Sequence, residues 1–194
     1  PSETSAPDSR SRVTWLTLLL APLSALFAAA VALRRWLYHA GILRRERLPL
    51  PVIVVGNISV GGTGKTPLVL WLAAQLRAAG YRPGIISRGY GGSVHTPQAV
   101  LSDSDPALSG DEPVLLARRS ACAVWVGRNR PAAARALLQA NPACNVIISD
   151  DGLQHYRLAR DCEIAVFDAA RGHGNGWMLP AGPLREPRSR LAGV

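Results

Sequence analysis

The longest apolar stretch of the chain runs without a charge from Val13 to Leu33. As an α-helix it would be about 32 Å long, which matches the roughly 30 Å hydrocarbon core of a bilayer. Pro22 and the alanine-rich second half argue against a simple spanning helix, so a helix lying in the membrane interface is a fair alternative. A cleaved signal peptide fits less well, because positive charge follows the run instead of preceding it. Residues 1–12 are polar and rich in Ser and Pro, which predicts a disordered lead.

The rest of the chain alternates short apolar runs with helical periodicity. Strands are expected at residues 52–55, 84–87, 98–101, 121–126, 145–150 and 164–168, with 98–101 at an edge, and helices at 68–79, 110–119 and 131–140. Polar residues 102–109 predict a turn region, and residues 169–187 a long loop. This alternation predicts an α/β domain, residues 48–194, with a P-loop NTPase-like parallel sheet flanked by helices.

Positive charge gathers directly behind the apolar run. The formal net charge is +9, and five arginines fall close together: Arg34, Arg35, Arg44, Arg45 and Arg47. Aromatic and aliphatic residues interleave with them from Trp36 to Leu43, which is typical of an amphipathic interfacial helix, although a helix packed on the domain would look the same. The cluster favours an anionic membrane surface over nucleic acid as partner. Residues 13–47 are therefore predicted to form a membrane-associated segment. Arginine-rich flanks mark the cytoplasmic side of a membrane, so the segment is expected at that face.

A phosphate-binding loop is predicted within residues 51–67, PVIVVGNISVGGTGKTP. Glycines let successive N–H groups point at phosphate oxygens, Lys65 supplies a charge for the outer phosphates, and the Thr66 hydroxyl is placed to hold Mg²⁺. Lys65 is the only lysine in the chain, which suggests a site that tolerates no guanidinium. The alternative is a glycine-rich turn that binds nothing, since Ser59 stands where the usual pattern has glycine. The predicted ATP-binding residues are Ser59, Val60, Gly61, Gly62, Thr63, Gly64, Lys65 and Thr66.

Carboxylates at two places extend this prediction. Asp150 and Asp151 end a buried strand, and a carboxylate at such a strand tip beside a phosphate loop holds Mg²⁺ in proteins of this class. A plain Asp-Gly turn is the alternative. Asp111 opens a helix, where acidic residues also serve as ordinary caps.

Other candidate residues give weaker signals. The loop SRGYGG is either a flexible substrate loop or a plain turn, and Arg130 follows a strand at the edge of the sheet where ligands bind. Three cysteines without metal-ligand spacing indicate reduced thiols in the cytosol.

Six segments occur together in one order: GNISVGGTGKTP, SRGYGG, GDEP, VGRNR, DDGLQH and PAGPLREP. From about Leu33 to Leu191 the chain resembles the N-terminal portion of the tetraacyldisaccharide 4'-kinases of lipid A synthesis, whose members look similar at Ser59. The resemblance implies an ATP- and Mg²⁺-dependent kinase at the cytoplasmic face of the bacterial inner membrane. Its substrate would be a lipid A disaccharide 1-phosphate precursor, phosphorylated on the 4'-hydroxyl, with no nucleic acid as partner.

The same resemblance implies residue roles. Asp111 would be the catalytic carboxylate near the attacking hydroxyl, with Lys65, Asp151 and His155 as further catalytic residues. Thr66, Asp150 and Glu186 would serve the metal, and Arg88, Tyr90 and Arg130 would contact phosphate or substrate. The family continues into a C-terminal part with a histidine that assists the catalytic aspartate, so we expect slow turnover by the present chain alone.

Other classes of P-loop protein share part of this pattern. A membrane-associated partition or targeting ATPase is the main alternative, but it carries a lysine near the start of the loop, where this chain has Val60. A GTPase needs a second lysine in its guanine-reading motif, and none exists here. A nucleic-acid-dependent ATPase should place its positive charge on the core domain.

Overall fold

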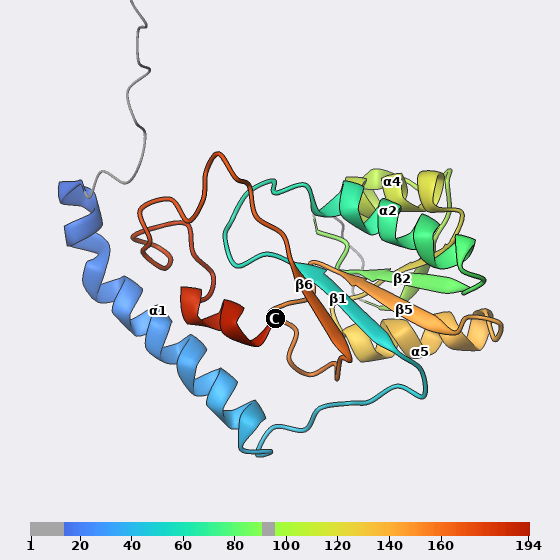
Figure 1. Cartoon of the computed structure of the whole chain (residues 1–194), viewed down its shortest axis with the longest axis horizontal. Coiled ribbons are helices and arrows are strands. Elements are labelled where there is room, and N and C mark those ends of the chain that lie inside the picture. The colour runs from blue at the N-terminus through green and yellow to red at the C-terminus, as the bar shows by residue number, and fades with distance from the viewer. Residues whose placement is uncertain (1–13, 91–95) are drawn as a thin grey trace, which may run out of the picture.

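The computed structural model describes residues 14–90 and 96–194, so the predicted disordered lead at 1–12 lies outside the described residues. Six strands form one sheet in the order β3-β4-β2-β5-β1-β6 (Figure 1). Their bounds are β1 Val52–Gly56, β2 Pro83–Ser87, β3 Gln98–Val100, β4 Ala123–Val126, β5 Val146–Asp150 and β6 Cys162–Ala165. The predicted α/β class is confirmed, and the last strand begins two residues earlier than predicted.

The sheet is mixed, which corrects the prediction of a parallel sheet. β1, β2, β4, β5 and β6 run parallel, whereas β3 pairs antiparallel with β4. Only residues 88–97 connect β2 to β3, and a parallel crossover needs a dozen or more residues. The short connection therefore explains why the edge strand runs in the opposite direction.

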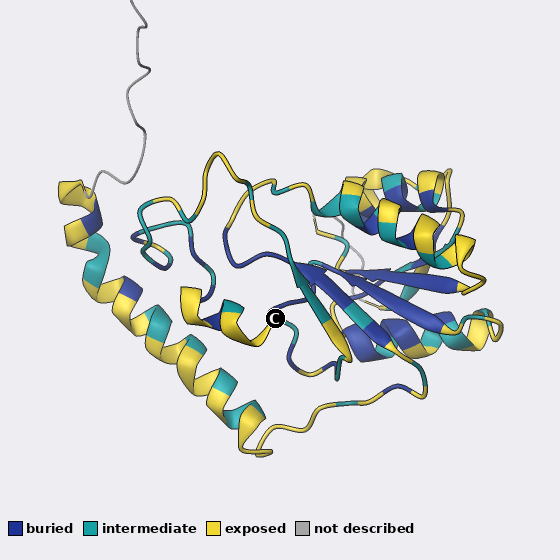
Figure 2. Cartoon of the chain, viewed as in Figure 1, coloured by how far each residue is buried: buried dark blue, intermediate teal, exposed yellow. Residues whose placement is uncertain are grey.

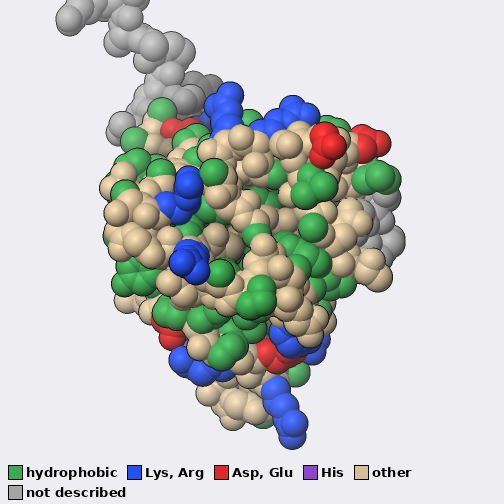
Figure 3. Space-filling model, turned by 90° about the vertical axis from the view of Figure 1, so that its right-hand side faces the viewer, with side chains coloured by type: hydrophobic (Ala, Val, Ile, Leu, Met, Phe, Trp, Pro, Cys, Tyr) green, Lys and Arg blue, Asp and Glu red, His purple; other side chains and the backbone are tan. Residues whose placement is uncertain are grey.

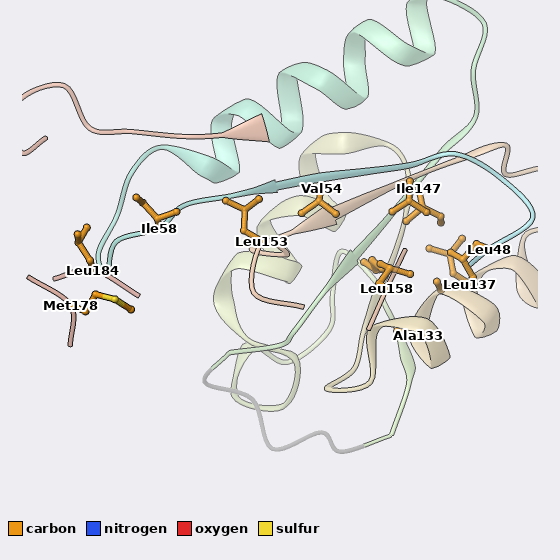
Figure 4. Close-up of a cluster of buried hydrophobic side chains, with 13 residues drawn as sticks. Leu48, Val54, Ile58, Ala133, Leu137, Ile147, Leu153, Leu158, Met178 and Leu184 are labelled. Atoms are coloured by element: carbon orange, nitrogen blue, oxygen red, sulfur yellow. The ribbon is translucent and has the colours of Figure 1, made fainter. Parts of the chain in front are cut away.

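Helices cover both faces of the sheet. α2 (Lys65–Ala78) and α4 (Asp111–Ser120) pack on one face, α5 (Arg130–Ala140) packs on the other, and the short α3 (Pro106–Ser109) lies in the predicted turn region. Figure 4 shows the core beneath α5 continuing from Leu137 past Val54 to Leu184 at the end of β1. This continuous core attaches the C-terminal segment to β1, the strand next to the edge strand β6.

The apolar N-terminal run forms a single helix, α1 (Trp15–His39), with Pro22 inside it. Thr14 caps it reciprocally with Thr17. The separate interfacial helix predicted from Trp36 to Leu43 is wrong, because Trp36 and Tyr38 belong to α1 and Leu43 lies beyond its end. By length and composition α1 could cross a membrane, a test that some core helices and signal sequences also pass.

One side of α1 packs on the domain, and the other is exposed (Figure 2). The Ser24 hydroxyl donates to the Met178 carbonyl at 2.8 Å, and Phe27 and Val31 pack against the core. Large apolar side chains cover the opposite side: Trp15, Leu18, Leu19, Leu23, Leu26, Leu33 and Trp36 are all more than half exposed. The helix thus joins the domain along one face and presents an unbroken apolar face outward.

Two adjacent leucines of α5 test the packing of this core. We expect Leu137→Ala to lower the free energy of unfolding by about 2–5 kcal/mol, because Leu137 is fully buried and the truncation leaves a cavity. Leu138→Ala is the matched control, since Leu138 is only partly buried and should cost clearly less. Urea denaturation of both variants measures the difference. Equal losses of unfolding free energy would contradict the observed orientation of α5, in which Leu137 faces the core.

Candidate active site

The predicted phosphate loop lies between β1 and α2, as the sequence indicates. Gly61 and Gly64 have φ angles of +106° and +80°, which side chains other than glycine rarely adopt. The Asn57 side-chain amide donates to the Thr63 hydroxyl at 3.1 Å, and the Val60 N–H donates to the Pro183 carbonyl at 2.8 Å. The loop is therefore held from both sides while the N-terminus of α2 faces a cavity, an arrangement that favours bound anions.

This cavity has a volume of about 600 Å³ and collects most of the predicted site. It is lined by Val60, Gly61, Gly62, Thr63, Gly64, Lys65, Thr66, Pro67, Tyr90, Asp111, Glu112, Asp151 and Arg185. Ser59 is absent from the lining: it is almost fully buried, forms a bridge with Leu184, and lies on the other side of the loop.

Lys65, Asp151 and Arg185 form an ion-pair cluster at the wall of the cavity. The Lys65 ammonium lies 3.6 Å from one Asp151 carboxylate oxygen, and Arg185 donates to the other at 3.0 Å. Burial acts to raise the pKa of Asp151, but Lys65 and Arg185 more than offset it, so the pKa is lowered. The ion pair with Asp151 thereby orients the Lys65 ammonium where phosphate oxygens would enter.

Asp150 lies one residue away in a different environment. It is 1 % exposed, accepts a hydrogen bond from the Ser87 hydroxyl at 3.3 Å, and has a second carboxylate oxygen without a hydrogen-bond partner among the described residues. Burial raises its pKa to about 6. A cation beside the free oxygen would supply the missing partner, so this carboxylate fits Mg²⁺.

Arg130 lies beneath this strand end and not at the cavity wall. It is 1 % exposed, and its guanidinium donates to the Asp150 carbonyl at 2.6 Å. Burial lowers the pKa of Arg130 to about 10, which leaves it charged at neutral pH. A direct substrate contact would require this side chain to become exposed, so the position favours holding the end of β5.

Asp111 occupies the first turn of α4, but its carboxylate does not cap the helix. The N-cap residue is Gly110, no side-chain cap hydrogen bond forms there, and Asp111 is exposed toward the cavity. At Gly110 a Cβ atom would lie 2.5 Å from the Tyr90 carbonyl oxygen, so Tyr90 lies directly against this helix start, while the last two glycines of SRGYGG lie outside the described residues. Tyr90 is 83 % exposed beside Asp111, whereas the exposed Arg88 does not line the cavity.

His155 and Glu186 also lie outside the cavity lining. Burial, with the positive charges of Arg130 and Arg88, lowers the pKa of His155 to about 3, so its imidazole is neutral at neutral pH. Glu186 is 1 % exposed and accepts hydrogen bonds from the Tyr156 hydroxyl and, at 3.4 Å, from the Gln154 amide.

Arg185 and Glu112 are the cavity residues to which the sequence gave no role. Arg185 reaches the cavity because its backbone N–H donates to the Ile58 carbonyl at 2.6 Å, at the start of the phosphate loop. In the sequence, the only indication that Arg185 has a function was its position in the LREP segment. The fold then brings that segment to the phosphate loop.

Among the described residues, no group of three or more His, Cys, Asp or Glu side chains is placed to hold a metal ion. Mg²⁺ in nucleotide sites is usually held by one or two carboxylates together with nucleotide phosphates and water. Thr66 and Asp150 are the residues suited to it.

A β-strand that passes through GGTGKT into a helix N-terminus, next to a strand that ends in aspartate, defines a P-loop nucleotide-binding protein. The chain belongs to the tetraacyldisaccharide-1-P 4'-kinase family, whose model matches residues 16–194.

Relatives named tetraacyldisaccharide 4'-kinase support this membership. The protein of Azoarcus sp. (strain BH72) is 64 % identical over 90 % of this chain and 51 % of its own length. That of Herminiimonas arsenicoxydans is 61 % identical over 93 % of this chain and 50 % of its own length. The chain therefore spans about half the length of the curated relatives it matches.

A solved structure agrees with the fold. The crystal structure of the "apo" form of LpxK from Aquifex aeolicus in complex with ATP matches with a TM-score of 0.84 and 35 % sequence identity. The match covers 92 % of this chain and 57 % of that chain.

The lowered pKa of His155 predicts a pH dependence of stability. The unfolded chain should bind a proton at this histidine below about pH 6.5, whereas the folded chain does so only near pH 3. Stability should therefore fall as the pH drops from 6.5, by up to about 1.4 kcal/mol per pH unit from this residue. Chemical denaturation between pH 7 and 5 should show a shallower fall for His155→Gln, and parallel profiles would exclude the buried neutral imidazole.

Proposed function

We propose that this chain is the nucleotide-binding half of an ATP-dependent kinase that phosphorylates the 4'-hydroxyl of a tetraacyldisaccharide 1-phosphate in lipid A biosynthesis. The observation that carries the proposal is that Asp111 shares one cavity with the phosphate loop and Lys65, and that its exposed carboxylate is not used to cap α4. A phosphoryl transfer site needs both, a cradle for the nucleotide phosphates and a base for the attacking hydroxyl.

The residues divide the reaction between them. The N–H groups of the loop and Lys65 would bind the β- and γ-phosphates of ATP, and Thr66 and Asp150 would hold Mg²⁺, which neutralises charge on the phosphates. Asp111 would accept the proton of the 4'-hydroxyl. At the same time the hydroxyl oxygen would bond to the γ-phosphorus, and the bond from that phosphorus to ADP would break. Asp151 would keep Lys65 and Arg185 at the cavity wall, and Tyr90 would contact the acceptor.

The exposed face of α1 supports a place at the membrane. Because α1 is bound to the domain along its other face, we favour a helix lying in the interface over one that spans the bilayer. The proposed location is the cytoplasmic face of the bacterial inner membrane, where a lipid substrate would reach the cavity. Figure 3 shows the face of the domain turned away from α1. There the Lys and Arg side chains of the described residues lie apart from one another and form no single basic patch like the one expected at a membrane-facing surface.

A partition or targeting ATPase, the main alternative from the sequence, is not favoured. The family match covers residues 16–194, and this includes the GDEP and LREP segments that supply Asp111 and Arg185 to the cavity.

Substitution of Lys65 tests nucleotide binding in the present chain. We expect Lys65→Ala to weaken Mg-ATP binding by roughly 1.5–3 kcal/mol, because a charge-assisted contact to phosphate is lost. Lys65→Arg should fail nearly as badly, since a planar guanidinium does not fit a cradle built around an ammonium. Calorimetric titration measures both, with Arg119→Ala, an exposed cation outside the cavity, as control. Unchanged affinity in Lys65→Ala would refute the phosphate-loop assignment.

Asp111→Asn tests the chemical step, in a chain of the relatives' full length. Loss of a general base should lower kcat by about a hundredfold or more, while ATP affinity and melting temperature stay nearly unchanged. Glu112→Gln is the matched control, because it removes the same charge from the same helix turn and cavity. If the two variants slow the reaction equally, Asp111 acts only through its charge and is not the base.

A further inference from the structure

A second cavity, of about 520 Å³, lies between the C-terminal end of α1 and the 3₁₀ helix η1 (Arg188–Gly193). None of its lining residues lines the phosphate-loop cavity. Five of its twelve lining residues carry basic side chains: Arg35, His39, Arg45, Arg160 and Arg190. The proposed kinase reaction leaves this cavity without a role.

The acidic residues of the cavity are already paired with other side chains. Glu163 accepts from Arg160 at 2.7 Å and from Arg190 at 2.5 Å, and these contacts exceed the effect of burial and lower its pKa. Asp161 pairs with Arg47 at 3.1 Å and accepts the Val52 N–H at 2.9 Å. These pairs neutralise the acidic side chains of the cavity.

Arg35 and Arg45 have no such partner. Neither forms an ion pair with any residue in the described part of the chain, and the Arg35 Nε is buried without a hydrogen-bond acceptor there. The C-terminal dipole of α1 accounts for a favourable position of positive charge, but it leaves this buried donor unsatisfied. An anion with several acceptor oxygens would satisfy it and match both guanidinium groups.

The position of the cavity relative to α1 indicates where the anion comes from. A helix is about 10 Å across, and an interfacial helix sinks its apolar face about 5–10 Å into the boundary between headgroups and acyl chains. The domain-facing side of α1, which carries Arg35, then lies at the level of the lipid phosphates. Trp36, Ile42 and Leu43 are exposed next to the basic residues and would enter the apolar layer.

We infer that this cavity binds the phosphate of an anionic membrane phospholipid, held by Arg35 and Arg45. The inference rests on the membrane association in the proposed function, and it adds a defined headgroup site to a general attraction between arginines and an anionic surface. Vesicle binding requires no nucleotide, so a failure of this inference and a failure of the proposed kinase activity are distinguishable.

Arg45 and Arg44 provide a matched test, because both are exposed and adjacent but only Arg45 lines the cavity. The probe is vesicles of phosphatidylcholine and phosphatidylglycerol, with binding measured by sedimentation at about 0.3 M salt, where diffuse attraction is largely screened. We expect Arg45→Gln to weaken binding about tenfold and Arg44→Gln by no more than about twofold. Equal losses would overturn the site and leave only diffuse attraction.

Two further arms exclude other occupants. Inorganic phosphate at constant ionic strength should leave vesicle binding unchanged, and full release at about 10 mM would assign the cavity to free phosphate instead of lipid. In a chain of the relatives' full length, the difference between the two variants should persist. If it disappears there, the rest of the chain covers the cavity and the inference is wrong. Melting temperatures near that of the unmodified chain show that both variants are folded.

Discussion

The parallel pairing of β1 with β5 is the constraint on which the site depends. It aligns Val55 with Asp150, so the phosphate loop and the acidic strand end leave the sheet at the same edge. β6 pairs on the other side of β1, which makes the end of β1 the point where the strand order reverses and where ligands bind in open α/β sheets. A different register between these two strands would separate Lys65 from Asp151, and this wall of the cavity would no longer form.

The two adjacent aspartates at the end of β5, Asp150 and Asp151, lie in different electrostatic environments. Lys65 and Arg185 compensate Asp151 and lower its pKa, whereas burial raises the pKa of neighbouring Asp150, one of whose oxygens has no hydrogen-bond partner in the described part of the chain. Two adjacent carboxylates in such different environments are typical of functional sites, because a purely structural turn would pair or expose both. The unpaired oxygen of Asp150 is the feature that a bound cation would complete.

A second group of buried charges connects α1 to the C-terminal segment. The Tyr156 hydroxyl donates to Glu186, the Tyr38 ring of α1 lies 5.8 Å from the Tyr156 ring, and the Arg190 guanidinium lies 5.9 Å from it. Glu186 directly follows Arg185, which enters the phosphate-loop cavity. α1 and the phosphate-loop cavity are therefore attached to the same short segment of chain.

The sequence by itself determined the features that depend on local order: the phosphate loop, the apolar helix, the alternation of strands and helices, and Asp150 and Asp151 at a strand end. Each follows from periodicity or from neighbouring residues. Only the tertiary structure decided the direction of β3, the burial of Arg130, the place of His155 and Glu186 outside the cavity, and the entry of Arg185 into it. These depend on contacts between segments far apart in the chain, such as the Arg185 N–H bound to the Ile58 carbonyl. Sequence patterns report which side chains are apolar or charged, but burial and pairing are set by which distant segments meet.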